Sequence, residues 1–167
     1  MGPRRLRSLL VAIVVVSAGC RLVDGPASVP PIGSPGTSAA PREVNLIARD
    51  YVFEPAELRL VPGESVLIHV VNAGLDLHEA VIGGPDVQAA WESAEAAASG
   101  APPGRTPEAS VAPGLAGLRV VVGSGQRVDV TYVVPPAAGP GLIVGCHLPG
   151  HFARGMAIPV RLVQPGS

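Results

Sequence analysis

The sequence is short of several residue types, and each shortage narrows what the protein can do. It contains no lysine, and its twelve arginines face thirteen acidic residues, which leaves a net charge of -1. Such a chain lacks the basic field that attracts phosphate backbones, so we do not expect nucleic acid to be a partner. The N-terminal apolar run, residues 9–16, has eight residues. A helix that spans a bilayer needs roughly 20 apolar residues, so this run is too short to be one.

The first part of the chain, residues 1–20, has the three parts of an export signal. Arginines come first, the apolar run follows, and small residues end it. The ending VSAGC resembles the lipobox of bacterial lipoproteins, in which the cysteine, here Cys20, becomes the lipidated first residue, although Ser17 stands where leucine is usual. The alternative is a plain secretory signal that is cut nearby. Lipidation would hold the protein at the outer face of the cytoplasmic membrane or in the periplasm.

The next segment, residues 21–42, is rich in proline, glycine, serine and alanine. It cannot bury enough apolar surface to offset the entropy lost on ordering, which predicts a disordered tether. The remaining residues, 43–167, are enough for one domain with its own core. We expect this domain to act as a monomer.

Short runs of alternating apolar and polar residues characterise the domain. Examples are ELRLV at 57–61, RVDVTY at 127–132 and IPVRL at 158–162. This period of two is typical of half-buried strands, and turn signals rich in glycine, proline and asparagine separate the runs. Roughly eight such strands predict an all-β fold, an antiparallel sandwich.

One segment breaks this pattern. The stretch PDVQAAWESAEAAAS, Pro85–Ser99, is rich in alanine and glutamate and opens with Pro-Asp, which predicts a helix. Together with the irregular loop that follows, it would form a short helical insertion at about 85–118, between two strands. We expect Trp91, the only tryptophan, to pack this helix onto the sheet rather than to dock a partner.

Cysteine, methionine and histidine are scarce, yet they gather in GCHLPGHFARGM, residues 145–156. If the first cysteine is lipidated, Cys146 has no disulfide partner, and a lone thiol in an oxidising compartment is a liability unless a metal binds it. His151 and Met156 follow on the same loop. Thiolate and thioether favour copper, and one thiolate, two imidazoles and a distant methionine describe a blue-copper site for electron transfer.

This copper site needs a second histidine, and the candidate is His78 in NAGLDLHEAVI. With this histidine and a terminal hairpin whose loop carries Cys, His and Met, the chain from about 44 to 163 resembles the cupredoxins, the plastocyanin and azurin family. The resemblance implies a Greek-key β-sandwich and one copper ion that cycles between Cu(I) and Cu(II). It also implies the metal ligands, which would be His78, Cys146, His151 and Met156.

The sequence departs from this family next to the first histidine. In plastocyanins and azurins an asparagine at that place ties the two copper loops together, whereas this chain has Glu79. Another residue, such as Asn72, could make the tie, or the tie could be absent.

A second resemblance concerns His147, directly after the cysteine. CHLPGHFARGM is similar to the blue-copper loop of multicopper oxidases, in which this histidine binds a neighbouring trinuclear cluster. That cluster needs more histidines than the four in this chain, and Gly145 stands where the oxidase motif has histidine. Oxidase activity is therefore excluded, and we expect His147 at the surface or beside the ligands. Four protein ligands leave no open position on the metal, so we do not expect an enzyme.

The leading hypothesis is an extracytoplasmic one-electron carrier that exchanges electrons with redox proteins and is attached to the membrane by a lipid anchor. By family resemblance, electrons would enter and leave through His151. One alternative is a copper sequestration or delivery protein of the cell envelope with the same ligands. Another is an interaction module whose copper site is vestigial.

Overall fold

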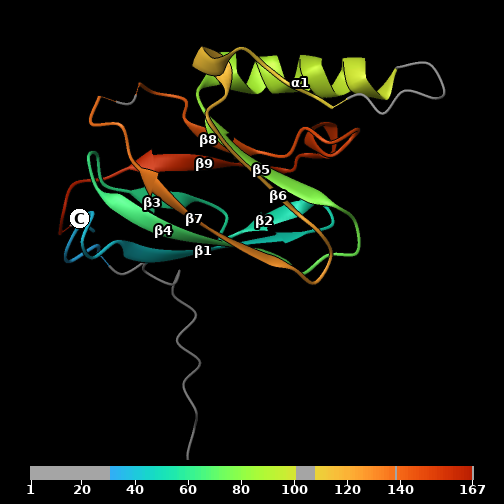
Figure 1. The fold of residues 1–167 in the computed structure, drawn as a ribbon. Helices are drawn as coiled ribbons and strands as arrows, with labels where there is room; N and C mark the ends of the chain where they lie inside the picture. The colour runs from blue at the N-terminus through green and yellow to red at the C-terminus, as the bar shows by residue number, and fades with distance from the viewer. Residues whose placement is uncertain (1–30, 101–107, 138, 167) are drawn as a thin grey trace, which may run out of the picture. The chain divides into compact units, whose positions relative to one another are not determined.

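The computed structural model describes residues 31–100, 108–137 and 139–166. The predicted export signal, Cys20 and the beginning of the predicted tether lie outside these ranges. The described residues form a β-sandwich with one α-helix (Figure 1). Within them, no helix has both the length and the apolar character needed to cross a membrane.

Nine strands build the two sheets of the sandwich. One sheet has the strand order β2-β1-β4-β7, and the other has the order β3-β9-β8-β5-β6. The strands are β1 (Arg42–Arg49), β2 (Val52–Glu54), β3 (Leu58–Leu60), β4 (Ser65–Asn72), β5 (His78–Gly83), β6 (Leu118–Val122), β7 (Arg127–Val133), β8 (Ile143–Gly145) and β9 (Ala157–Leu162).

The predicted β-sandwich is confirmed, but the sheets are mixed rather than antiparallel. β1 pairs with β4 in parallel, from Arg42 opposite Val66 to Ala48 opposite Asn72. β3 pairs with β9 in parallel as well. Because β3 belongs to the other sheet, the chain crosses over before β4 returns beside β1, and a crossover allows two strands to run the same way.

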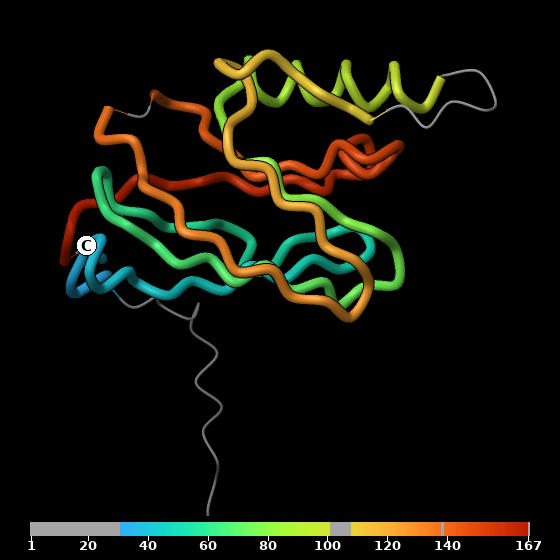
Figure 2. The backbone as a smooth tube through the Cα atoms, viewed as in Figure 1, coloured from blue at the N-terminus to red at the C-terminus, as the bar shows by residue number. Residues whose placement is uncertain are grey.

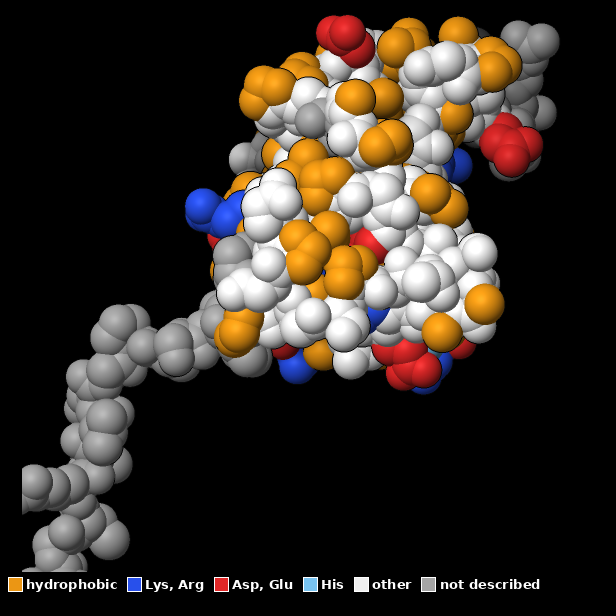
Figure 3. Space-filling view, turned by 90° about the vertical axis from the view of Figure 1, so that its left-hand side faces the viewer, with side chains coloured by type: hydrophobic (Ala, Val, Ile, Leu, Met, Phe, Trp, Pro, Cys, Tyr) orange, Lys and Arg blue, Asp and Glu red, His pale blue; other side chains and the backbone are white. Residues whose placement is uncertain are grey.

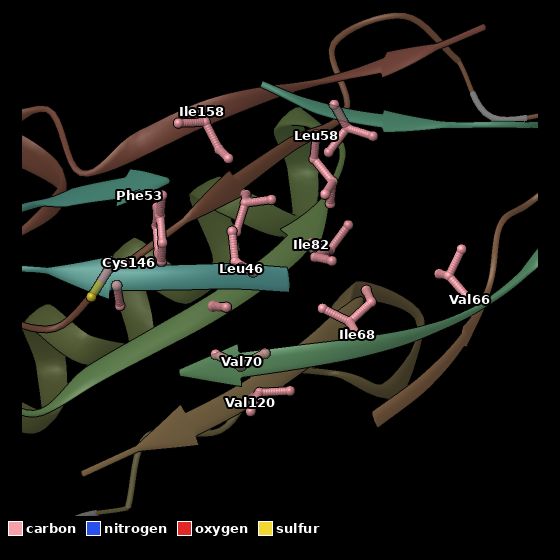
Figure 4. Packing of buried hydrophobic residues seen from close by; sticks show 14 of the residues in the cluster. Leu46, Phe53, Leu58, Val66, Ile68, Val70, Ile82, Val120, Cys146 and Ile158 are labelled. Atoms are coloured by element: carbon pink, nitrogen blue, oxygen red, sulfur yellow. The ribbon is translucent and has the colours of Figure 1, made fainter. Parts of the chain in front are cut away.

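The core lies between the two sheets (Figure 4). Leu46, Phe53 and Ile68 are among its fully buried side chains. Cys146 and Met156 belong to the same cluster, and Figure 4 shows Cys146 at one end of it. Two of the predicted metal ligands therefore belong to the dry, close-packed core.

The predicted helix is confirmed over its whole length as α1 (Pro85–Ser99), with proline in its first turn. Figures 1 and 2 show α1 lying over β8 and β9 and the loop between them. Trp91 packs as expected: its indole N–H donates to the Ala116 carbonyl at 2.9 Å. The Arg119 guanidinium of β6 lies 4.4 Å from the centre of its ring. A 3-10 turn, η1 (Pro113–Leu115), precedes β6.

Residues 31–41 form neither helix nor strand, but their backbone is bonded to the sandwich. The Ser65 amide donates to the Gly36 carbonyl at 3.0 Å, and the Gly36 amide donates to the Glu64 carboxylate at 3.2 Å. The predicted boundary between tether and domain stays a prediction. Figure 3 shows the end of the domain on the left of Figure 1, where apolar side chains lie among polar ones and charges of both signs.

Candidate metal centre

Two loops at one end of the sandwich carry the predicted ligands. His78 is the first residue of β5, directly after the loop 73–77. Cys146 follows the last residue of β8, and His151 precedes a second 3-10 turn, η2 (Phe152–Arg154). Met156 lies just before β9. Each ligand thus stands at the end of a regular element, which fixes its backbone.

Three of the predicted ligands converge in the folded chain. His78, Cys146 and His151 each offer one ligand atom, and these atoms lie within 4.8 Å of one another. The Cys146 Sγ is 3.3 Å from the His151 Nδ1, and the two imidazole centres are 5.1 Å apart. All three side chains are buried. The cluster therefore has the compactness and the dryness of a metal site.

The hydrogen-bonding state of His78 supports a metal at this place. Its Nε2 is paired with the Asp50 carboxylate at 2.7 Å. Its Nδ1 is the buried side-chain nitrogen or oxygen atom without a hydrogen-bond partner in the part of the chain that the structure describes. A buried polar atom without a partner is costly. A metal ion bound by this nitrogen would remove that cost. The residues of the cluster therefore fit a metal ion.

The environment of Cys146 controls when its sulfur can bind a metal. Burial raises the pKa of the thiol to about 11, although the amides of Glu79 and Leu148 lower it in part. The Glu79 amide points at the sulfur from 3.5 Å. The metal-free thiol is therefore protonated at neutral pH, and a metal ion would bind in exchange for this proton.

The environment of His151 favours its neutral, ligating form. Burial, followed by the neighbouring His78, lowers the pKa of the His151 ring below its usual range. A neutral imidazole keeps a lone pair for a metal. The ring lies edge-on to the Tyr51 ring, with 4.8 Å between the centres.

Backbone hydrogen bonds hold the loop from Cys146 to Met156 closed. The Cys146 amide donates to the Met156 carbonyl at 3.1 Å, and the Met156 amide donates to the His151 carbonyl at 3.2 Å. Met156 is fully buried. Its position at the closing point of the loop suits a fourth, weak ligand, and its coordination of the metal stays a prediction.

The tie between the two metal loops is made by Glu79 itself, so the suggestion of Asn72 is wrong. One Glu79 carboxylate oxygen accepts from the His147 amide at 3.0 Å, and the other accepts from the Arg119 side chain at 2.6 Å. Asn72 bonds other groups instead: its side chain donates to the Asp76 carbonyl and to the Val122 carbonyl of β6, and it accepts from the Gly74 amide. A carboxylate works here because Arg119 balances its charge.

His147 is not at the surface, and the expectation that it lies beside the ligands is the correct one. The residue is 2% exposed, and its ring stacks on Phe152 with 4.7 Å between the centres. Its Nδ1 is 2.7 Å from the Glu92 carboxylate, and its Nε2 is 2.6 Å from the Gln88 side-chain oxygen. His147 thus connects the metal loop to α1, and its two ring nitrogens face Glu92 and Gln88.

The space around Gly145 explains why this position lacks a side chain. A Cβ atom there would lie 2.5 Å from the Gln88 side-chain oxygen, 3.0 Å from the His147 ring and 3.0 Å from the Phe152 ring. A histidine at Gly145, as in the multicopper-oxidase motif, would require the Gln88 side chain and the two rings to shift. The packing that holds His147 against α1 thus accounts for glycine at position 145, where the oxidase motif has histidine.

Two residues near the site were not found by the sequence reasoning. Asp50 bonds His78, and Tyr51 covers His151 and donates to Asp76 at 2.7 Å. Both lie in the turn between β1 and β2, far from the ligands in sequence. Nothing in the local sequence pattern distinguishes them from other strand-end residues.

No family model matches the sequence, and no curated protein sequence matches it. Among solved structures, auracyanin B is 25% identical, with a TM-score of 0.56, covering 81% of this chain and 99% of that one. Reduced auracyanin from Roseiflexus castenholzii is 20% identical, covering 77% and 100%, with a TM-score of 0.55. An azurin from Methylomonas sp. strain J is 20% identical, covering 75% and 100%, with a TM-score of 0.51.

These folds and the ligand cluster together define the class of the protein. The two-sheet arrangement is that of auracyanins and azurins. The ligand atoms of His78, Cys146 and His151 form a cluster whose composition suits a blue copper site. The chain therefore has the fold of the cupredoxins, and its His-Cys-His cluster fits a blue copper protein.

Proposed function

We propose that this chain is a type 1 copper protein that carries single electrons outside the cytoplasm. The observation that carries the proposal is the convergence of ligand atoms from His78, Cys146 and His151 in one buried cluster. The His78 Nδ1, which has no hydrogen-bond partner among the described residues, supports it. Met156, which is fully buried at the end of the same loop, would complete the set as a fourth, weak ligand. When copper is bound, it supplies the one-electron couple between Cu(II) and Cu(I).

The ligand set and the rigidity of its loops suit such a couple. Cu(I) prefers soft ligands, and Cu(II) prefers nitrogen and oxygen in tetragonal arrangements, so a thiolate with two imidazoles is acceptable to both. The backbone bonds between Cys146, His151 and Met156 resist movement of the loop. Little rearrangement is then needed when an electron arrives or leaves, which favours fast transfer.

His151 is the ligand through which we propose that electrons pass. Of the three clustered ligands it is the most exposed, at 8%, whereas His78 and Cys146 are fully buried. Its ring contacts Tyr51, and the Arg154 guanidinium lies 4.2 Å from the centre of the tyrosine ring. A redox protein that docks over this region would come near the copper.

The place of action is inferred from the sequence alone. Residues 1–20 have the pattern of an export signal that ends at a lipobox-like Cys20. A lipid on this cysteine and the following tether would hold the domain at the outer face of the cytoplasmic membrane or in the periplasm.

The proposal is tested by the visible spectrum of the purified protein after addition of Cu(II), then ascorbate, then an oxidant. We expect an intense thiolate-to-copper band that bleaches on reduction and returns on oxidation. The variant Cys146→Ser lacks the thiolate, so any Cu(II) that it binds should not give the thiolate-to-copper band. Tight Cu(I) uptake without any band in the wild type would contradict electron transfer and support copper handling. No uptake would indicate a vestigial site.

A further inference from the structure

The carboxylate of Asp50 contacts the Nε2 edge of the His78 ring, which leaves Nδ1 as the nitrogen available to a metal. Its Oδ1 lies 2.7 Å from the His78 Nε2. An ionised carboxylate can only accept, so this nitrogen carries the proton of the neutral ring and Nδ1 carries the lone pair. Nδ1 is the buried atom that has no partner among the described residues. Asp50 thus selects the tautomer that presents the lone pair to the ligand cluster.

We infer that Asp50 is a positioning residue that lowers the reduction potential of the copper site through His78, an inference that rests on the proposed function. A carboxylate that accepts a hydrogen bond from a ligating histidine fixes the ring and raises its basicity as a ligand. A more basic imidazole stabilises Cu(II) more than Cu(I), because the higher charge gains more from it. The oxidised state is then favoured.

The carboxylate is itself held in place by the loop that leads to His78. Its Oδ2 accepts from the Leu75 amide at 2.9 Å, and its Oδ1 accepts from the Asp76 amide at 3.2 Å. These bonds leave the side chain little freedom to turn away from the ring. Asp50 is only partly buried, with 29% of its side chain exposed, while the His78 ring is fully buried.

Gly74 provides the space that this pair needs. A Cβ atom at this position would collide with the Asp50 Oδ1 and would lie 2.9 Å from the His78 Nε2. The Gly74 carbonyl accepts from the Ser124 hydroxyl at 2.7 Å, and its amide donates to the Asn72 side chain at 2.9 Å. The loop is therefore built closely around the hydrogen bond between Asp50 and His78.

The inference is tested by the reduction potential of Asp50→Asn beside a matched control, Asp76→Asn. Both substitutions remove one negative charge from this loop region, and the charge of Asp76 also acts on His151. Asp76 accepts from the Tyr51 hydroxyl and has no hydrogen bond to His78 among the described contacts. The control therefore measures the effect of charge without the ligand contact.

We expect Asp50→Asn to raise the reduction potential while the thiolate-to-copper band is retained. Removal of such a partner costs a metal site roughly 10- to 100-fold in affinity. Because the loss should fall mainly on Cu(II), we expect the ratio of Cu(II) affinity to Cu(I) affinity to fall by roughly tenfold. For one electron, this fold-change is about 59 mV. Asp76→Asn should change the ratio by less than about threefold, because Asp76 acts only through its charge, which water screens, and not through a hydrogen bond to His78.

Nitrogen-15 NMR of the wild-type Cu(I) protein, which is diamagnetic, tests the same hydrogen bond without a substitution. We expect a proton on the His78 Nε2 that exchanges slowly with water. A His78 ring with a bare Nε2, or equal shifts of potential in the two variants, would overturn the inference. A wild-type protein without the thiolate band would instead refute the proposed function, so the two failures are distinguishable.

Discussion

Glu79 connects the two loops that carry the metal ligands, and it does so with a buried charged group. Its amide faces the Cys146 sulfur, one carboxylate oxygen accepts from the His147 amide, and the other bonds Arg119. The Glu79 side chain is fully buried, and that of Arg119 is 23% exposed. One residue thus orients the thiolate and fixes the distance between the loops.

Removal of this carboxylate should therefore be costly. In Glu79→Ala, the His147 amide and the Arg119 guanidinium both lose a buried partner, and we expect the metal-free protein to lose about 3–5 kcal/mol of its free energy of unfolding. Urea unfolding measures this loss. Glu79→Gln keeps an acceptor for the His147 amide and should lose clearly less. If Glu79→Ala were as stable as the wild type, the Glu79 carboxylate would not be holding the two ligand loops together.

At this scale, the sequence predicts the ligands but not the residues that support them. Cys146, His151 and Met156 stand out because their types are rare in the chain and lie on one short loop. Glu79 and Asp50 are ordinary acidic residues. Their partners are fixed by folding, since the Glu79 carboxylate meets an amide 68 positions away and Asp50 meets a ring 28 positions away.

Among the elements, α1 acts as a clamp on the metal loop. Gln88 donates from one side-chain nitrogen to the carbonyls of Val81, Gly83 and Ile143, which join β5 and β8. These bonds direct its oxygen toward the His147 ring. Further along the helix, Glu95 bonds Arg119 at 2.8 Å. The insertion is thus joined to the sheet beside the copper ligands by a continuous polar network.

This clamp predicts that a single substitution on α1 is felt in the sandwich and at the metal. Gln88→Ala leaves three carbonyls and the His147 ring without this partner, and we expect a loss of about 1–3 kcal/mol in the free energy of unfolding. Ser93→Ala is the control, because the Ser93 hydroxyl is exposed and donates to the Ala89 carbonyl of the same helix. It should change stability by less than about 0.5 kcal/mol.

Thermal unfolding and the electron paramagnetic resonance spectrum of the Cu(II) form measure the two effects. A copper spectrum altered in Gln88→Ala but not in Ser93→Ala would show that the helix positions the loop. If both variants matched the wild type, α1 would be a passive insertion.

The elements differ in how well the sequence predicts them. The bounds of α1 follow from local signals, a proline at its start and a glycine after its end. β7 follows from its strict alternation. The parallel pairing of β1 with β4 could not be predicted, because it depends on β3 leaving for the other sheet. Periodicity within a strand carries no information about the direction of its neighbour.

In the whole molecule, ion pairs fasten the sandwich at places far from the metal. The Glu64 carboxylate accepts from the Arg42 side chain at 2.9 Å and from the Val61 amide at 2.7 Å, which joins β1 to the turn before β4. Asp129 bonds Arg127, and it also bonds the His69 ring of β4 at 2.9 Å. These pairs make the stability of the entire domain depend on pH.

The direction of that dependence follows from the pKa values. Hydrogen bonds from Arg127, then His69, lower the pKa of Asp129 from 3.8 to about 2. Burial by itself would raise the pKa of Glu64, but the bonds from Arg42 and the Val61 amide outweigh it and lower the pKa below 4.5. A carboxyl group whose pKa is lower in the folded state stabilises the protein above its unfolded pKa. That stability is lost as the pH falls toward the folded pKa.

We therefore expect the urea midpoint of the metal-free protein to fall between about pH 5 and pH 2, and Asp129→Asn to show a shallower fall. The variant lacks the group that takes up a proton on unfolding, so its midpoint should be lower at pH 6 and approach that of the wild type at pH 2. Metal-free protein is required because acid also displaces copper from its ligands. If the wild type and Asp129→Asn lost stability in parallel, the strand pair β4–β7 would owe nothing to this carboxylate. The variant Glu64→Gln, measured beside Asp129→Asn, distinguishes the Arg42–Glu64 pair from the Arg127–Asp129 pair. If the urea midpoint fell less steeply with pH in Glu64→Gln alone, the acid sensitivity of the domain would lie at the start of β4.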